Sequence, residues 1–199
     1  FNYKMNFFKK LLHLTTSSEE KEITKQEVNL SLEESFVHHF IEKGGKFLYC
    51  IKLEEVLVHF KQIVEENNWT DIVVTDKDLS KLIKKIDVKQ HVNQNASIPF
   101  FTTCEHLIAD NGNILFSSNQ LNSVRLSELP QDLIVYASVS QLVKNTGEGL
   151  TGIKTNFKGN IPTNISAIKN YNINKNDDNF LNYGNTNSKN LYLLLFEDL

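Results

Sequence analysis

The sequence predicts an α/β domain with a mainly parallel sheet, and three observations support that class. Short apolar runs typical of buried strands alternate with segments that carry apolar residues at helical spacing, as in a parallel sheet with connecting helices. The chain has 199 residues, which is enough for one domain with a full core and too few for two. Its 40% apolar and 23% charged residues are typical of a soluble globular protein.

The first element of this domain is a helix predicted over residues 31–45. Glu34 follows Ser31 at the spacing of a capping box, which marks a helix start, and Gly44 and Gly45 end the helical pattern. The apolar face of this helix is expected to comprise Phe36, Phe40 and Ile41.

Two strand–helix pairs are predicted next. Residues 46–50 and 71–75 are short apolar runs, and each precedes a helical pattern, over residues 53–68 and 76–86 respectively. The inward-facing residues of the longer helix are expected to be Val56, Phe60, Ile63 and Val64.

Three further strands are predicted in the second half of the chain, over residues 113–118, 132–138 and 190–199. The segment before the last strand, residues 170–190, is rich in asparagine, with nine among its 21 residues. Because asparagine favours turns and local side-chain hydrogen bonds over sheet ladders, this segment is predicted to be a surface loop.

The first 31 residues differ in character from the remainder. Residues 1–14 carry an apolar stretch that Lys9 and Lys10 interrupt, which predicts a short amphipathic helix rather than a signal peptide. A polar tether follows, so the chain divides into an N-terminal helix and tether, residues 1–31, and an α/β domain, residues 32–199. No apolar run approaches the ~18–20 residues that cross a bilayer, so a cytoplasmic protein without a membrane span is expected.

The charge and the cysteines argue against several classes of function. The formal net charge of −3 provides no basic field for nucleic-acid binding, so no nucleic-acid partner is expected. Cys50 and Cys104 are the two cysteines, and they lie far apart outside any CxxC motif. That arrangement argues against a disulfide scaffold, an iron–sulfur cluster or a zinc site, and we expect neither a metal nor a cofactor.

Residues 102–120 hold the densest group of reactive side chains in the sequence. Cys104 and His106 are two positions apart, a spacing that points them to different sides of a helix, so a buried structural cysteine is expected rather than a nucleophile with its base. A helical segment over residues 107–109 is expected to lead through a turn into the predicted strand at 113–118. Polar side chains beyond such a parallel strand commonly bind ligands, and here they are Ser117, Ser118, Asn119 and Gln120.

An ordered series of short motifs extends from this stretch to the end of the chain. It consists of Thr103, Glu105, Ile108-Ala109, Gly112, Ile114-Leu115, Leu129-Pro130 before the strand at 132–138, the segment GNIPTNI, and KNLYLLLFEDL. This order resembles the LUD domain of the lactate utilisation protein C family, over roughly residues 32–199. The order of the motifs carries the resemblance, because no single motif is diagnostic.

The resemblance implies a fold and a setting. It implies a three-layer α/β sandwich similar to that of the sugar-phosphate isomerases and CoA transferases. It also implies a role in the bacterial oxidation of L-lactate beside iron–sulfur partner proteins. Because this chain lacks cluster cysteines, any redox centre would lie in those partners.

Three departures from the family pattern put a transfer of catalysis in doubt. Thr163-Asn164-Ile165 stands where the family has Ala-Asp-Ile, so an amide replaces a carboxylate. Residues 186–189 stand where the family has His-Gly-Pro, and Asp110 is a shortened version of the family's glutamate.

The candidate site residues follow from this stretch and the resemblance. The candidate ligand-binding residues are Thr103, Asp110, Ser117, Ser118, Gln120 and Arg125. The guanidinium of Arg125 has the planar shape that holds a carboxylate or phosphate. The candidate catalytic residues are Glu105 and Asp110, and Asp110 is expected to act either as a base or as a cap of the turn.

Two functions remain open at this level. The first is a lactate-utilisation accessory protein or subunit that acts with iron–sulfur partners and binds a small organic anion. The alternative is a stand-alone isomerase- or acyl-transferase-like enzyme on a small anionic substrate, which needs an activated carboxylate in its pocket. The fold alone does not decide between them.

Overall fold

The computed structural model describes residues 30–157, 159–171 and 188–198. The N-terminal helix predicted within residues 1–14, nearly all of the tether and most of the predicted asparagine-rich loop lie outside the described residues. Two sheets organise the described part of the chain, one with six strands and one with four.

The six-stranded sheet is entirely parallel, with strand order β1-β10-β7-β4-β2-β3. Its strands are β1 (Lys46–Cys50), β2 (Asp71–Val74), β3 (Lys89–His91), β4 (Phe100–Thr102), β7 (Asp132–Ser138) and β10 (Asn190–Phe196). The register of β10 on β7 runs in step from Asn190 opposite Asp132 to Phe196 opposite Ser138. Both faces of these central strands are covered, which explains their nearly continuous apolar sequences.

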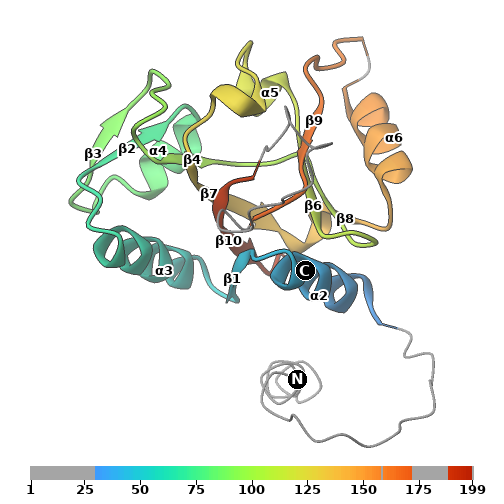
Figure 1. Cartoon of the computed structure of the whole chain (residues 1–199), viewed down its shortest axis with the longest axis horizontal. Helices are drawn as coiled ribbons and strands as arrows, with labels where there is room; N and C mark the ends of the chain where they lie inside the picture. The colour runs from blue at the N-terminus through green and yellow to red at the C-terminus, as the bar shows by residue number, and fades with distance from the viewer. Residues whose placement is uncertain (1–29, 158, 172–187, 199) are drawn as a thin grey trace, which may run out of the picture.

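Two helices, α3 (Leu53–Glu66) and α4 (Lys77–Leu82), cover one face of this sheet (Figure 1). The four residues predicted to face inward on α3 are buried, which confirms the helical spacing: Val56, Phe60, Ile63 and Val64. Phe60 packs against Phe101 of β4 with ring centroids 4.7 Å apart. The sheet is thereby anchored to α3 through its interior strand.

Helix α2 (Leu32–Glu42) lies on the opposite face. Ser31 and Glu34 form the predicted capping box, with Ser31 Oγ accepting from the Glu34 main-chain N–H. Phe36 and Phe40 are fully buried as predicted. Ile41 was predicted to be buried, but it is 43% exposed because it lies one residue, about 100° around the helix, from Phe40.

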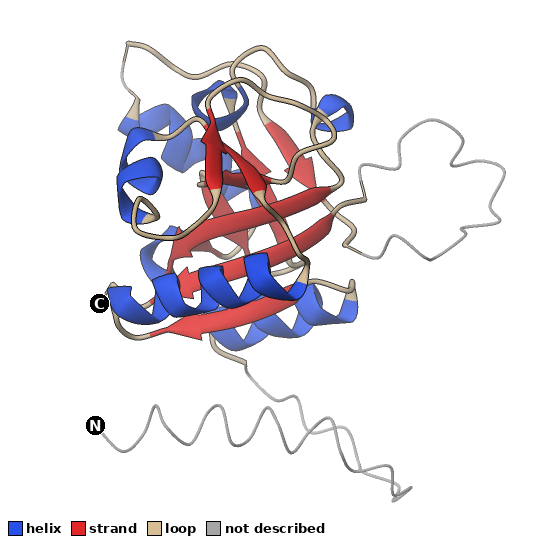
Figure 2. Cartoon of the chain, turned by 90° about the vertical axis from the view of Figure 1, so that its left-hand side faces the viewer, coloured by secondary structure: helices blue, strands red, loops and turns tan. Residues whose placement is uncertain are grey.

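The smaller sheet, with order β8-β5-β6-β9, lies on the same side as α2. Its strands are β5 (His106–Ile108), β6 (Asn113–Phe116), β8 (Leu142–Val143) and β9 (Ser166–Ile168), and the remaining elements are α5 (Ser118–Leu121), η1 (Leu126–Glu128), η2 (Val139–Gln141) and α6 (Thr146–Asn156). Figure 1 shows α6 beside this sheet, on the side away from α3 and α4. In Figure 2 the strands form the centre of the domain between helices, so the predicted three-layer α/β fold is confirmed.

Two predictions about the stretch from 107 to 118 are wrong. Residues 107–109 were predicted to be helical, whereas β5 runs antiparallel to β6 as a hairpin. Residues 113–118 were predicted to be a strand of the parallel sheet, whereas β6 ends at Phe116 and is paired antiparallel with both β5 and β9. Gly112, at φ +64°, allows the tight reversal that turns a short apolar run back onto its neighbour.

Candidate functional site

The chain adds strands on opposite sides of the adjacent strands β2 and β4. The chain continues from β2 to β3 on one side, and from β4 towards β7 and β10 on the other. In open α/β sheets, the carboxyl ends of two strands that diverge in this way leave a crevice where ligands bind. A cleft of about 300 Å³ lies at this position.

Three segments of the chain line this cleft. Residues 75–78 follow β2 and begin α4, while Thr102 is the last residue of β4 and Thr103 follows it. The third segment consists of Asn119, Gln120 and Asn122 in and just after α5. The lining is therefore assembled from segments distant in sequence, and all of its side chains are polar.

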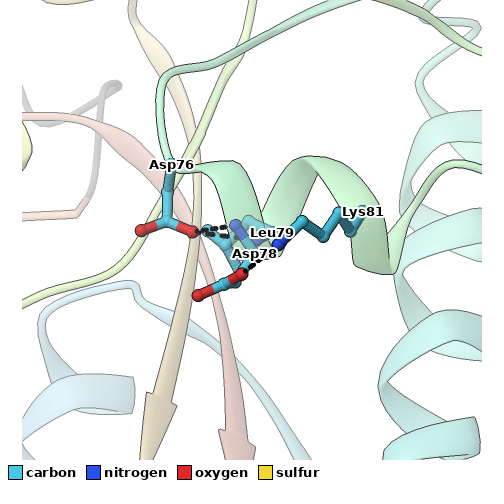
Figure 3. A network of polar contacts seen from close by, with 4 residues as sticks. All are labelled: Asp76, Asp78, Leu79 and Lys81. Carbon is cyan, nitrogen blue, oxygen red and sulfur yellow. Dashed lines mark hydrogen bonds and ion pairs between the residues drawn. The ribbon is translucent and has the colours of Figure 1, made fainter.

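The first wall is held in shape by its own aspartates. Asp76 Oδ1 accepts from the main-chain N–H groups of Asp78, at 2.9 Å, and Leu79, at 2.8 Å, as an N-cap (Figure 3). The Asp78 carboxylate pairs with Lys81 Nζ at 2.9 Å on the helix surface. Both carboxylates therefore have local partners, although each retains a second oxygen.

The charges in the cleft are few and mixed. Asp76 and Asp78 carry negative charge and Lys77 positive charge, while the other lining residues offer neutral hydroxyls and amides. Hydroxyls and amides both donate and accept hydrogen bonds. The arrangement suits a small polar molecule held by directed hydrogen bonds and one ammonium group.

The second wall, α5, is tied to Glu105. One carboxylate oxygen, Glu105 Oε1, accepts from Ser117 Oγ at 2.5 Å, Asn119 Nδ2 at 2.8 Å and Gln120 Nε2 at 3.1 Å. Ser117 also caps α5, because its Oγ accepts from the Asn119 main-chain N–H at 3.0 Å. Glu105 thus lies behind the cleft and contacts two of the amides that line it.

The structure brings some of the predicted site residues together at this cleft. Thr103 and Gln120 line it. Ser117 is fully buried and, with Glu105, supports the α5 wall from behind. Hydrogen bonds join Glu105, Ser117 and Gln120, and Thr103 shares the lining of the cleft with Gln120.

The other predicted residues lie elsewhere. Asp110 is exposed in the turn of the β5–β6 hairpin, at the end of the hairpin opposite Glu105. Ser118 binds the chain at Thr163 through both its main-chain N–H and its Oγ. Arg125 is exposed at the start of η1, where its main-chain N–H donates to Glu128. None of the three belongs to the described lining of the cleft.

The Cys104 thiol is buried, as predicted for a structural cysteine. Burial raises its pKa, and the neighbouring Glu105 carboxylate raises it further, so the reactive thiolate is disfavoured. His106 faces a different partner, with Nδ1 3.2 Å from the Gln141 carbonyl oxygen. The two side chains do not form a nucleophile–base pair.

Sequence reasoning missed the wall formed by residues 75–78. The signal was present, because the apolar run of β2 ends directly in Thr75 and Asp76. The rule applied to Ser117, that polar residues after a buried strand face a ligand site, would have selected them. The sequence does not show that β2 and β4 are adjacent strands of the sheet.

Among the residues that the structure describes, no helix combines the length and apolar character needed to cross a membrane. Within the same residues, no cluster of three or more histidine, cysteine, aspartate or glutamate side chains has the geometry of a metal site.

The fold and the cleft define the class as an open α/β protein with a polar site at the carboxyl edge of its parallel sheet. A family model of the LUD domain matches residues 36–196, and the chain therefore belongs to the LUD domain family. The structure is similar to the crystal structure of a DUF162 family protein from Deinococcus radiodurans, with a TM-score of 0.55, 13% sequence identity, and coverage of 84% of this chain and 99% of that one. At this identity the likeness shows the fold alone, and no curated protein matches the chain.

Proposed function

We propose that this LUD domain protein acts in lactate utilisation, as a cytoplasmic accessory protein or subunit that binds a small organic anion in the cleft between β2 and β4. The observation that carries the proposal is the position of a polar cleft of about 300 Å³ at the point where the sheet changes direction. That volume is at the lower end of the range for small-molecule sites, roughly 300–1,000 Å³, which suits a ligand of a few atoms.

The groups in the cleft can hold a hydroxycarboxylate. Lys77 supplies an ammonium group for the carboxylate, and the hydroxyls of Thr102 and Thr103 and the amide of Gln120 supply neutral hydrogen bonds. The family match favours lactate among such ligands. In this proposal iron–sulfur partner subunits hold the redox centre of L-lactate oxidation, and this chain presents or senses the organic acid.

The test is a thermal-shift screen of the full chain with L-lactate, pyruvate and ribose 5-phosphate. A ligand at ~100 times its dissociation constant adds ~2.7 kcal/mol to the free energy of unfolding by mass action. We expect L-lactate or pyruvate to raise the melting temperature. Lys77→Ala should remove most of the rise, because it deletes the positive charge of the lining.

Two control variants locate the site. Lys154→Ala removes an exposed lysine of α6, in another layer of the fold, and should leave the ligand-induced rise unchanged. Arg125→Ala should also leave the ligand-induced rise unchanged if the anion binds in the cleft. Loss of the rise in Arg125→Ala would indicate that the anion binds near η1 instead. A rise with ribose 5-phosphate alone would favour the isomerase- or transferase-like enzyme, and no rise with any of the three would reject a small-anion site.

A further inference from the structure

The α5 wall of the cleft depends on a residue that does not itself line the cleft. Glu105 contacts Asn119 and Gln120 through a single carboxylate oxygen, and the same oxygen accepts from the hydroxyl of Ser117. Three side-chain donors therefore meet on one oxygen, and the Ser117 bond, at 2.5 Å, is the shortest of the three.

The main chain at Glu105 is itself fixed from two sides. The Glu105 N–H donates to the Leu115 carbonyl oxygen of β6 at 2.8 Å. The Gln141 side-chain amide donates to the carbonyl oxygens of Cys104, at 2.6 Å, and Glu105, at 3.3 Å, while its Oε1 accepts from the Ser138 N–H at 2.8 Å. The carboxylate therefore starts from an anchored backbone next to the ends of β4 and β7.

The orientation of the Gln120 amide is determined by two bonds of opposite sense. Its Oε1 accepts from the Ser117 main-chain N–H at 2.9 Å, and its Nε2 donates to Glu105 Oε1 at 3.1 Å. Turning the amide over would place oxygen against carboxylate and N–H against N–H, with both bonds lost. Because Gln120 is only 8% exposed, water does not replace them, and the remaining Nε2–H is the group it can direct to a ligand.

The second oxygen of Glu105 has no hydrogen-bond partner among the described residues. All three side-chain donors gather on Oε1 instead, although two of them belong to residues that line the cleft. A carboxylate with this pattern is arranged to hold neighbouring side chains in place.

We infer that Glu105 is a positioning residue: its Oε1 atom sets the orientation of the Asn119 and Gln120 amides and thereby the hydrogen-bond donors that the cleft offers its ligand. The effect of Glu105 on ligand binding rests on the proposed function. Its effect on the orientation of the amides does not, because that orientation is a property of the free protein. It differs from the catalytic base considered for Glu105 on sequence grounds, which would require the carboxylate itself to exchange a proton with the ligand.

Two variants of Glu105 distinguish the effect of side-chain length from the effect of its negative charge. Glu105→Gln keeps the reach of the side chain and an acceptor oxygen while it removes the charge. Glu105→Asp keeps the charge but withdraws the carboxylate by ~1.5 Å, about one carbon–carbon bond. Glu148→Ala serves as the matched control, because Glu148 accepts from the Lys144 N–H at the start of α6, away from the cleft.

The first measurement needs no ligand. In a nitrogen-15 proton correlation spectrum, the side-chain amide signals of Asn119 and Gln120 should shift strongly in Glu105→Asp, shift slightly in Glu105→Gln, and stay in place in Glu148→Ala. Unchanged amide signals in a folded Glu105→Asp protein would overturn the inference, whatever the outcome with lactate.

The second measurement uses L-lactate as the probe in calorimetric titration. We expect Glu105→Asp to raise the dissociation constant about tenfold or more and Glu105→Gln to change it less than about threefold. Loss of binding in Glu105→Gln with unmoved amide signals would show that the carboxylate acts on the ligand directly and would reject the positioning role. Absence of lactate binding to the wild type, with the amide shifts as expected, rejects the proposed ligand and leaves the positioning of the amides established.

Discussion

Polar residues gather at both ends of the β5–β6 hairpin, but their surroundings differ. At the turn end, residues 109–113, side chains one turn apart on α2 and its C-cap bind oxygen atoms of the turn. These contacts are Ser35 Oγ to Ala109 O at 2.9 Å, His39 Nδ1 to Ala109 O at 3.0 Å, and Lys43 Nζ to Asn111 O and Asn113 Oδ1. The turn is thereby tied to the adjoining helix.

At the open end, the polar groups support the α5 wall of the cleft from behind. Glu105 and Ser117 lie opposite each other where the two strands begin and end, and their hydrogen bonds lead to Asn119 and Gln120. Polar residues that are close together in the sequence therefore do not all belong to one site. A hairpin separates its two ends by the length of its strands, ~3.3 Å for each residue, so Asp110 and Glu105 serve different neighbours.

The largest expected effect is on stability at the turn end. Gly112 has φ +64°, and a Cβ atom there would lie 2.5 Å from the Phe40 main-chain nitrogen of α2. Gly112→Ala therefore combines a left-handed backbone with a clash that the helix must yield to, and we expect a loss of about 3 kcal/mol in the free energy of unfolding. Urea titration measures it.

Gly159→Ala is the matched control for this variant. Gly159 also has positive φ, +88°, but an added Cβ would have nothing within 4 Å. Gly159→Ala should lower the free energy of unfolding by about 1–2 kcal/mol, because only the strain of the left-handed backbone contributes. Equal losses in the two variants would show that α2 does not press on the turn.

A smaller effect is expected from Tyr171, whose buried hydroxyl donates to the Gly112 carbonyl oxygen at 2.7 Å. Tyr171→Phe keeps the ring beside Phe40 and leaves that oxygen without its donor, for a loss of about 1 kcal/mol at neutral pH. Burial, and secondarily the nearby Cys104, raises the Tyr171 pKa well above its ordinary value.

The pH dependence has a definite sign. A folded-state pKa above the unfolded value means that the contribution of Tyr171 is complete below about pH 10 and is lost as the pH rises from there towards the folded-state pKa. Urea titrations at pH 8 and pH 10.5 should therefore show a smaller alkaline loss for Tyr171→Phe than for the wild type. An identical loss in both proteins would show that Tyr171 ionises as freely in the folded state as in the unfolded state.

The smallest effect is expected at Asp110. Its side chain is exposed in the turn, so Asp110→Asn should change the free energy of unfolding by less than about 0.5 kcal/mol. It should also leave the lactate-induced thermal shift intact, because the cleft is at the other end of the hairpin. Loss of that shift in Asp110→Asn would indicate that the ligand binds at the turn end of the hairpin and not at the open end.

The accuracy of the sequence predictions follows the length of the pattern. Helix α3 extends over 14 residues and repeats its apolar face several times, so its type and its buried side were predicted correctly. The run at 107–109 contains three apolar residues and fits a strand as well as a helix. Antiparallel pairing with β6 makes this run a strand. So short a pattern does not show which segment it will pair with.

Only two of the predicted ligand-binding residues, Thr103 and Gln120, line the cleft. Thr103 was named from the resemblance, and Gln120 because polar residues follow an apolar run. The residues 75–78 have the same local signature, and nothing in the sequence indicated that they face α5.

The sequence alone was enough to predict the helices α2, α3 and α4, the strands β1, β2, β7 and β10, the capping of α2 and the burial of Cys104. Each of these depends on apolar periodicity or on residues a few positions apart. The pairing of β2 with β4 and the hydrogen bonds from the α5 amides to Glu105 could not be predicted from the sequence and are seen only in the folded domain. Strand order and the separation of the hairpin's ends arise from contacts between segments distant in the chain. Such contacts are selected by the packing of the whole core, and no local pattern of residues encodes them.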